Sequence, residues 1–281
     1  MASLPAIAPI YAGLAERIAA RLGRPRVRAL HLPPPGAAAK DAEFCALELT
    51  DGAFGFSFVR IGAVEELLRA RHGAGMLAGV EAAVLARGYA DADPAAKALG
   101  FAAINALSQQ LFVRANWTPP AADDSLGEIE PEHGEHIGMV GLFRPLLARV
   151  HAAGARLTVL ELKPELAGEH EHYRVTLDPG DLVACDKVVS TCTVMLNDTL
   201  DAVLAACRNA RRFAIVGPTG GCVPDPLFAR GVAALGGRRV VDAQSFREAF
   251  CSGGKWGGFA AKYVIAQRDY PGLERLLQRA G

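Results

Sequence analysis

Cys192 and Cys222 stand at positions where a soft metal ion or a nucleophilic reaction would use them. Each follows a predicted short strand, which lies within Leu182–Thr191 in the first case and over Phe213–Val216 in the second. If both strands belong to one sheet, the two thiols converge on a single pocket, where thiolates favour Cu(I) or zinc and also serve as nucleophiles. The alternative is that both are small buried hydrophobic side chains.

Two short clusters of histidine and glutamate provide further candidate metal ligands. His133 and His136 lie three residues apart, and His170 and His172 alternate with glutamates. Imidazole and carboxylate suit divalent ions such as zinc or nickel, and a His-x-His pair in an extended strand places both rings on one face. Neither spacing is a complete four-ligand signature, so solvated surface clusters are the alternative. The predicted cofactor is a transition metal, either copper, zinc or nickel.

The elements that must position these residues fall into two regions. Residues 1–116 read as β-rich runs followed by helices, and residues 117–135, rich in Pro, Asp, Glu and Gly, read as a linker. Residues 136–281 alternate short apolar strands with helices, which predicts a parallel sheet. Near its end this pattern predicts a helix over Pro226–Leu235 and a strand over Arg239–Val241. The predicted fold class is α/β, with a small α+β domain followed by a parallel-sheet domain.

Ligands of open parallel sheets bind beyond the carboxyl ends of the strands, where the strand order reverses. The first predicted strand of the second region runs into a glycine turn at Gly141, and the second ends at Glu161. A carboxylate at that point accepts hydrogen bonds from ribose hydroxyls in nucleotide-binding sheets, or it ligates a cation. The glycine turn is not a GxGxxG motif, which disfavours a dinucleotide. Residues after the later strands either cap helices or bond to a ligand: Thr191, Thr193, Asn197, Pro218 and Thr219.

Composition narrows the class of partner. The 281 residues hold 30 basic and 30 acidic side chains, so no positive surplus points to nucleic acid or to an anionic membrane. No apolar run reaches the roughly 20 residues that span a bilayer, and the N-terminus lacks a basic n-region. The six cysteines form no CxxC pair, so we expect reduced thiols in a cytoplasmic protein. Residues 117–181 hold 12 acidic against 5 basic residues, and we expect cation chemistry there.

A series of short motifs then occurs in a recognisable order. Its members are Gly138-Met139-Val140-Gly141, Val159-Leu160-Glu161, Thr191-Cys192-Thr193, Asn197-Asp198-Thr199-Leu200, Gly217-Pro218-Thr219, Gly231-Val232 and Val241-Asp242, with Ala103-Ile104-Asn105 upstream. In this order and spacing the chain resembles the bacterial and archaeal family described as "putative heavy-metal chelation" proteins. The sequence departs from that family's pattern at Gly220-Gly221-Cys222.

The resemblance implies a domain over residues 1–116 similar to the N-terminal domain of enolases, and a Rossmann-like domain with a C-terminal extension over residues 136–281. It also implies a homodimer and a site between the domains, into which Asn105 would reach. The implied function is the binding or processing of a heavy metal, or of a metal-chelating small metabolite. Two alternatives stay open. One is a metal-independent lyase or transferase in the biosynthesis of a sulfur-containing chelator; the other is an enzyme that binds S-adenosylmethionine or NAD.

Overall fold

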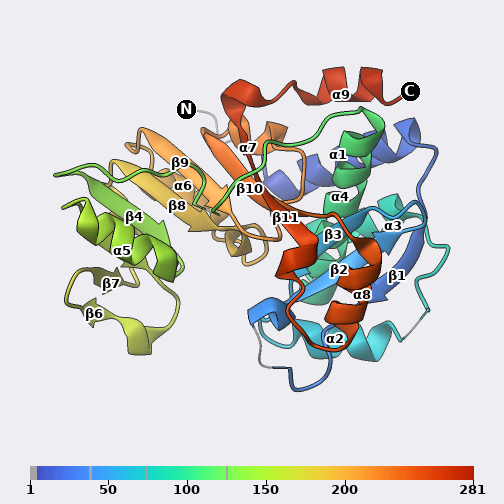
Figure 1. Cartoon of the computed structure of the whole chain (residues 1–281), viewed down its shortest axis with the longest axis horizontal. Coiled ribbons are helices and arrows are strands. Elements are labelled where there is room, and N and C mark those ends of the chain that lie inside the picture. Colours follow the sequence, from blue (N-terminus) through green and yellow to red (C-terminus); the bar gives the residue numbers. More distant parts are fainter. Residues whose placement is uncertain (1–4, 38–39, 74, 125) are drawn as a thin grey trace.

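The computed structural model describes residues 5–37, 40–73, 75–124 and 126–281. Two sheets organise this part of the chain (Figure 1). A three-stranded antiparallel sheet is built from the N-terminal region, and an eight-stranded, mostly parallel sheet is built from the C-terminal region. The predicted α/β fold class, with a small sheet followed by a larger parallel one, is confirmed.

The small sheet has the order β1-β2-β3 and is followed in the chain by helices. The elements of this region are α1 (Ile7–Arg21), β1 (Val27–His31), β2 (Phe44–Leu49), β3 (Phe54–Phe58), α2 (Val64–Arg71), α3 (Ala82–Ala86) and α4 (Pro94–Arg114). Helix α4 begins where Asp93 accepts a hydrogen bond from the Ala96 amide at 3.2 Å, an N-cap that leaves Pro94 at the first helical position. Every residue from Ala98 to Phe112 is buried, so α4 is an interior helix.

The large sheet has the order β11-β10-β9-β8-β4-β5-β7-β6. Its strands are β4 (His136–Val140), β5 (Arg156–Leu160), β6 (Gly168–Glu169), β7 (Arg174–Thr176), β8 (Lys187–Thr191), β9 (Arg212–Val216), β10 (Ala234–Val240) and β11 (Ala260–Ala266). Its helices are α5 (Arg144–Ala152), α6 (Leu200–Ala206), α7 (Asp225–Phe228) and α8 (Ala243–Cys251), and α9 (Leu273–Arg279) follows the last strand. The chain runs from β4 outward to β7 and then returns to the other side of β4 at β8, so the strand order reverses between β4 and β8.

One predicted helix is wrong in its second half. The structure ends α7 at Phe228 and places Leu235 in β10, where the pattern predicts a helix over Pro226–Leu235. Gly236 and Gly237 lie inside this strand because another segment approaches it closely. A Cβ atom on Gly237 would lie 2.4 Å from the Gly220 carbonyl oxygen. Gly236 and Gly237 are therefore required by packing within a strand.

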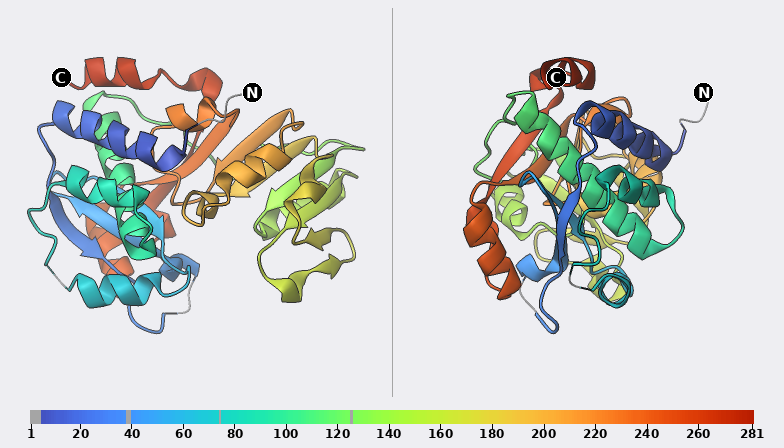
Figure 2. Two further views of the ribbon diagram at one scale, coloured as in Figure 1. Left: turned by 180° about the vertical axis from the view of Figure 1, so that it is seen from behind. Right: turned by 90° about the vertical axis from the view of Figure 1, so that its right-hand side faces the viewer.

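Segments from the end of the chain return to the N-terminal region (Figure 2). Helix α8 lies between β10 and β11 in sequence and covers the small sheet, where Phe246 packs on Phe54 and the Trp256 ring stacks on Phe56 at 4.9 Å. Helix α9 lies beside α1, and Arg17 pairs with Glu274 at 2.7 Å. The two sheets are thus held together by packed side chains from both ends of the chain.

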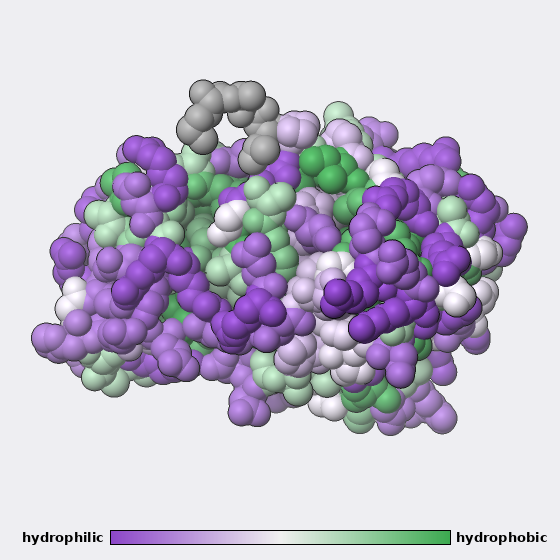
Figure 3. Space-filling model, turned by 90° about the horizontal axis from the view of Figure 1, so that it is seen from above, coloured by the Kyte–Doolittle hydropathy of each residue, from purple (hydrophilic) through white to green (hydrophobic). Residues whose placement is uncertain are grey.

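The surface over α1, α9 and the nearby strands shows small hydrophobic patches among hydrophilic residues (Figure 3). None of the helices in the described part of the chain is long and apolar enough to span a membrane.

Gly55 is the point where β3 touches α4 most closely. A Cβ atom there would lie 2.1 Å from the Ala102 carbonyl oxygen and 2.2 Å from the Ala106 amide nitrogen. We expect Gly55→Ala to lower the free energy of unfolding by about 3 kcal/mol or more, since backbone cannot move aside without separating the sheet from the helix. Urea unfolding measures this change.

Gly13→Ala is the matched control, because Gly13 lies in α1 and a Cβ atom there would meet nothing within 4 Å. Alanine in a helix is favoured over glycine, so this variant should be more stable by up to about 1 kcal/mol. Equal stability of the two variants would contradict the close approach at Gly55.

Candidate functional site

The reversal of strand order brings three of the predicted site residues to one edge of the large sheet. Gly141 follows β4 with φ of 80°, and a Cβ atom on it would lie 3.2 Å from the Thr191 side chain at the end of β8. Glu161 follows β5, and its Oε1 accepts a hydrogen bond from the Leu142 amide at 2.9 Å. The carboxylate thus occupies one backbone N–H group of the glycine turn that leads to α5.

The hydroxyl and amide residues after β8 form hydrogen bonds mainly with neighbours in their own segment. Thr191 Oγ1 accepts a hydrogen bond from the Thr193 amide at 3.3 Å, and Asn197 Oδ1 accepts one from the Thr199 hydroxyl at 2.6 Å. Pro218 lies half-buried in the loop after β9. Thr191, Thr193 and Asn197 are partly exposed at the same edge, and their first role is to cap the short turns that precede α6.

Asn105 reaches from α4 to the large sheet, as its predicted place between the domains requires. Its Nδ2 donates to the Phe56 carbonyl at 2.7 Å and to the Thr219 carbonyl at 2.8 Å. Both carbonyls only accept, so the amide nitrogen must face them and Oδ1 faces elsewhere. Asn105 Oδ1 and Thr219 Oγ1 are both buried without a hydrogen-bond partner in the described residues. Asn105 therefore ties β3 to the loop after β9.

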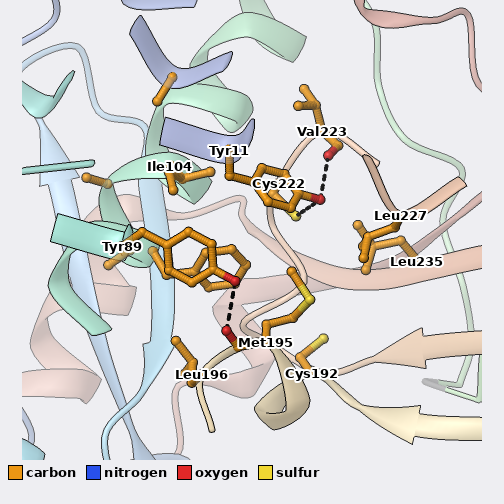
Figure 4. Packing of buried hydrophobic residues seen from close by; sticks show 14 of the residues in the cluster. Tyr11, Tyr89, Ile104, Cys192, Met195, Leu196, Cys222, Val223, Leu227 and Leu235 are labelled. Atoms are coloured by element: carbon orange, nitrogen blue, oxygen red, sulfur yellow. Dashed lines mark hydrogen bonds between the residues drawn. The ribbon is translucent and has the colours of Figure 1, made fainter. Parts of the chain in front are cut away.

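Cys192 and Cys222 both lie in the interior between the sheets (Figure 4). Cys192 Sγ donates weakly to the Gly217 carbonyl at 3.6 Å, and Cys222 Sγ donates to the Tyr11 hydroxyl at 3.2 Å. Burial raises the pKa of the Cys222 thiol to about 12. Burial first, and the nearby Cys222 second, raise the pKa of the Cys192 thiol well above its usual range. Both side chains are thus neutral thiols near physiological pH.

The surroundings of the thiols come from distant parts of the sequence. Tyr11 in α1 donates to the Val223 carbonyl at 3.1 Å, and Tyr89 donates to the Met195 carbonyl at 2.8 Å. In the view of Figure 4 the Met195 thioether is drawn between the side chains of Cys192 and Cys222. Sequence reasoning missed Tyr11, Tyr89 and Met195, because nothing in their local pattern separates them from ordinary core residues.

His133 and His136 lie away from the carboxyl edge. His136 opens β4 at the amino edge of the sheet, opposite the edge that carries Glu161, and its Nε2 is 2.8 Å from Thr158 Oγ1. Burial lowers the pKa of the His136 imidazole. His133 is exposed beside Gly154. These two histidines therefore do not join the thiols or Glu161.

His170 and His172 lie in the turn between β6 and β7, where no extended strand aligns their rings. The His170 ring stacks on Tyr173 at 4.6 Å, and the His172 ring stacks on His151 at 3.7 Å. Within the described residues, no group of three or more His, Cys, Asp or Glu side chains is placed to hold a metal ion. The predicted ligands therefore do not assemble into one conventional site.

Comparison with known proteins places the chain in a family. Two family models, both described as "Putative heavy-metal chelation", match residues 42–108 and residues 125–267. The second match alone covers about half of the chain. The chain belongs to this family. The resemblance predicted from the short motifs is thereby confirmed, and the family description suggests metal chelation without establishing it.

One curated relative is described as an uncharacterised protein. A protein from Methanocaldococcus jannaschii is 28% identical over 152 residues, which are 52% of this chain and 55% of that protein. The chain thus spans little more than half the length of this curated relative.

Two solved structures of unknown function, both from this family, resemble the fold. The one from Pyrococcus horikoshii has a TM-score of 0.66 at 17% identity and covers 92% of this chain and 99% of its own. The one from Desulfitobacterium hafniense has a TM-score of 0.63 at 21% identity, covering 91% and 98%. At this identity the likeness shows the fold alone. The enolase-like character of the first domain, the domain boundaries and the homodimer stay predictions.

Asn105→Asp should be strongly destabilising. The substitution keeps the shape but replaces the amide donor by an oxygen that faces the Phe56 and Thr219 carbonyls, in a fully buried position. We expect a loss of about 3 kcal/mol or more in the free energy of unfolding, measured with urea. Asn209→Asp is the control, because exposed Asn209 makes one longer bond to a carbonyl, at 3.3 Å. A similar loss in both variants would contradict the bridging role of Asn105.

Thiol accessibility gives a second test. Of the six cysteines, Cys251 is exposed and the other five are buried. We expect the native protein to release one rapid equivalent from Ellman's reagent at pH 8 and six after unfolding, because buried neutral thiols do not react. Cys251→Ser should abolish the rapid phase. A rapid phase that is lost instead in Cys192→Ser or Cys222→Ser would show that these thiols are open to solvent.

Proposed function

We propose that the chain binds a soft heavy-metal ion, delivered free or on a small chelating metabolite, between Cys192 and Cys222 at the junction of the two sheets. The observations that carry this proposal are the burial of both thiols in the same apolar cluster and the closeness of Cys222 to Cys192, which raises the pKa of the Cys192 thiol. Thiolate and thioether sulfur select Cu(I) among the biologically common metals. Two thiols suit this ion better than zinc, which takes four ligands.

The surroundings of the thiols fit ligands that ionise only when a metal arrives. Without a cation, a buried thiolate is costly, and the raised pKa of each thiol reflects this cost. A metal ion supplies the compensating charge and displaces the protons. The Tyr11 hydroxyl lies 3.2 Å from Cys222 Sγ and lowers the pKa of that thiol. It donates its single proton to the Val223 carbonyl, so it must turn away from that carbonyl to donate to a thiolate. Tyr11 therefore serves as a positioning residue.

Entry to this region depends on the loop after β9. A Cβ atom on Gly220 would lie 2.9 Å from Cys192 Sγ, and one on Gly217 would lie 3.6 Å from it. These glycines therefore cover the Cys192 thiol with backbone atoms only. An ion or chelate that reaches Cys192 from this side must pass the loop, and its entry requires the contacts of the loop with Asn105, Gln109 and Ser108 to open.

The alternatives have less support. The Glu161 carboxylate already accepts the Leu142 N–H of the turn before α5, which is where a phosphate of a nucleotide cofactor would bind. This disfavours an enzyme that uses NAD. The raised pKa of Cys192 and Cys222 disfavours either thiol as the nucleophile of a lyase or transferase, because such a nucleophile needs a lowered pKa.

Anaerobic titration with Cu(I) in competition with a chromophoric chelator tests the proposal. We expect one ion per chain and the release of about two protons, since both thiols start protonated. Loss of a hydrogen-bond partner of a metal ligand weakens binding by roughly 10- to 100-fold. Cys192→Ser and Cys222→Ser each remove a ligand itself, so each should weaken binding by at least roughly 100-fold.

Cys207→Ser is the matched control, because Cys207 is also buried with its pKa raised to about 12. Its affinity for Cu(I) should equal that of the unchanged protein. Equal Cu(I) affinity in Cys192→Ser, Cys222→Ser and Cys207→Ser would refute the site. Loss of binding only in Cys251→Ser would assign the ion to the exposed thiol instead.

A further inference from the structure

A pocket of about 110 Å³ opens between α4, the β2–β3 turn and β10. This space is several times what one water molecule needs. Its lining includes Asp51 from the β2–β3 turn, Arg239 from β10, and Gln109, Gln110 and Val113 from α4. The thiols do not line it, so it is separate from the proposed metal region.

Gln109, which lines this pocket, carries an unsatisfied oxygen. Its Nε2 donates to the Gly221 carbonyl at 2.8 Å and to the Tyr263 hydroxyl at 2.9 Å. The Gly221 carbonyl only accepts, so the nitrogen of the amide must face it. Gln109 Oε1 is then left on the other side, buried and without a partner among the described residues. A buried acceptor in this state costs free energy until a donor reaches it.

Gln110 adds a second such oxygen. The side chain is 5% exposed, and its Oε1 is also buried without a hydrogen-bond partner in the described part of the chain. Gln109 and Gln110 are adjacent in α4 and both line the same pocket. Two unpartnered acceptors on residues that line one pocket favour a ligand with several N–H or O–H donors.

Arg239 needs an anionic partner, whereas the two glutamine oxygens need hydrogen-bond donors. It lies two residues after Gly237 in β10 and therefore on the same face of the strand, the face that meets Tyr263 and α4. Its guanidinium makes no hydrogen bond or ion pair with any described residue. A partly buried guanidinium without a carboxylate is suited to bind one from a ligand.

We propose that this pocket binds a small amino acid or a closely related zwitterion. The ammonium group donates to Gln109 Oε1 and Gln110 Oε1, and the carboxylate pairs with Arg239. The Asp51 carboxylate at the rim attracts an ammonium group and repels an anion, so it favours a zwitterion over a simple anion. Exposed Val113, also at the rim, leaves room for a short apolar side chain.

Calorimetric titration of the full chain with L-alanine, L-serine and glycine tests the proposal, with ethylamine and propionate as the two halves of the ligand. We expect saturable millimolar or tighter binding of at least one amino acid. Each half alone should bind at least about tenfold more weakly, because it satisfies only one side of the pocket. Cys192→Ser should leave amino-acid binding unchanged, so this outcome is independent of the metal proposal.

Arg239→Gln and Gln110→Met should each weaken amino-acid binding at least about tenfold. Gln110→Met keeps the side-chain volume and removes the oxygen. Arg114→Gln, at the exposed end of α4 and outside the pocket, is the charge-matched control and should bind as the unchanged protein does. Circular dichroism and melting temperature verify that each variant is folded.

Three results would overturn the assignment. The first is the absence of saturable binding for all three amino acids at millimolar concentration. The second is equal affinity for an amino acid and for propionate or ethylamine. The third is unchanged affinity in folded Arg239→Gln or in folded Gln110→Met.

Discussion

Burial of α4 between the two sheets is the constraint on which the rest of the structure depends. Every residue from Ala98 to Phe112 is buried, so its polar side chains must find partners inside the protein. On one side, β3 approaches the backbone of Ala102 and Ala106 closely, because Gly55 has no side chain. On the other side, the amide of Asn105 holds the loop after β9. The helix thereby fixes the separation of the two sheets.

The loop between Gly217 and Val223 takes its shape from this helix. The Val223 amide donates to the Ser108 hydroxyl at 3.1 Å, and the Gly221 carbonyl accepts from Gln109. From the opposite side, Gly237 allows the loop to approach β10. Because both faces of the loop are held, the position of Cys222 at its end is fixed as well. The thiol region and the pocket beside Gln109 thus depend on the same few contacts.

The sequence allowed the order of elements to be predicted where the pattern is regular. The alternation of strands and helices from residue 136 onward predicted the large sheet, and the strand ends predicted that Gly141, Glu161 and Thr191 share one edge. The prediction failed at the start of β10. Glycines occur within this strand because a loop that is distant in sequence packs against it, and the local pattern does not show that contact.

The candidate site was predictable only in part, for a related reason. The positions of Cys192 and Cys222 after two strands pointed to one pocket, and both lie in the same interior region. Their remaining neighbours, Tyr11, Tyr89 and Met195, come from other parts of the chain. Local periodicity marks such residues as core without indicating what they face. Only the packing of α1 and α4 against the large sheet makes them neighbours of the thiols.

The distribution of charge explains why the candidate cation site uses sulfur. The acidic segment from residue 117 to residue 181 is expected to attract cations, but several of its carboxylates pair with basic residues in the large sheet or directly after its last strand. Glu128 pairs with Arg212 and Arg268, and Glu135 pairs with Lys187 at 3.0 Å. These pairs neutralise carboxylates that a hard divalent ion would need. The uncharged thiols of the interior have no such competitor, and a thiophilic ion is the cation that they suit.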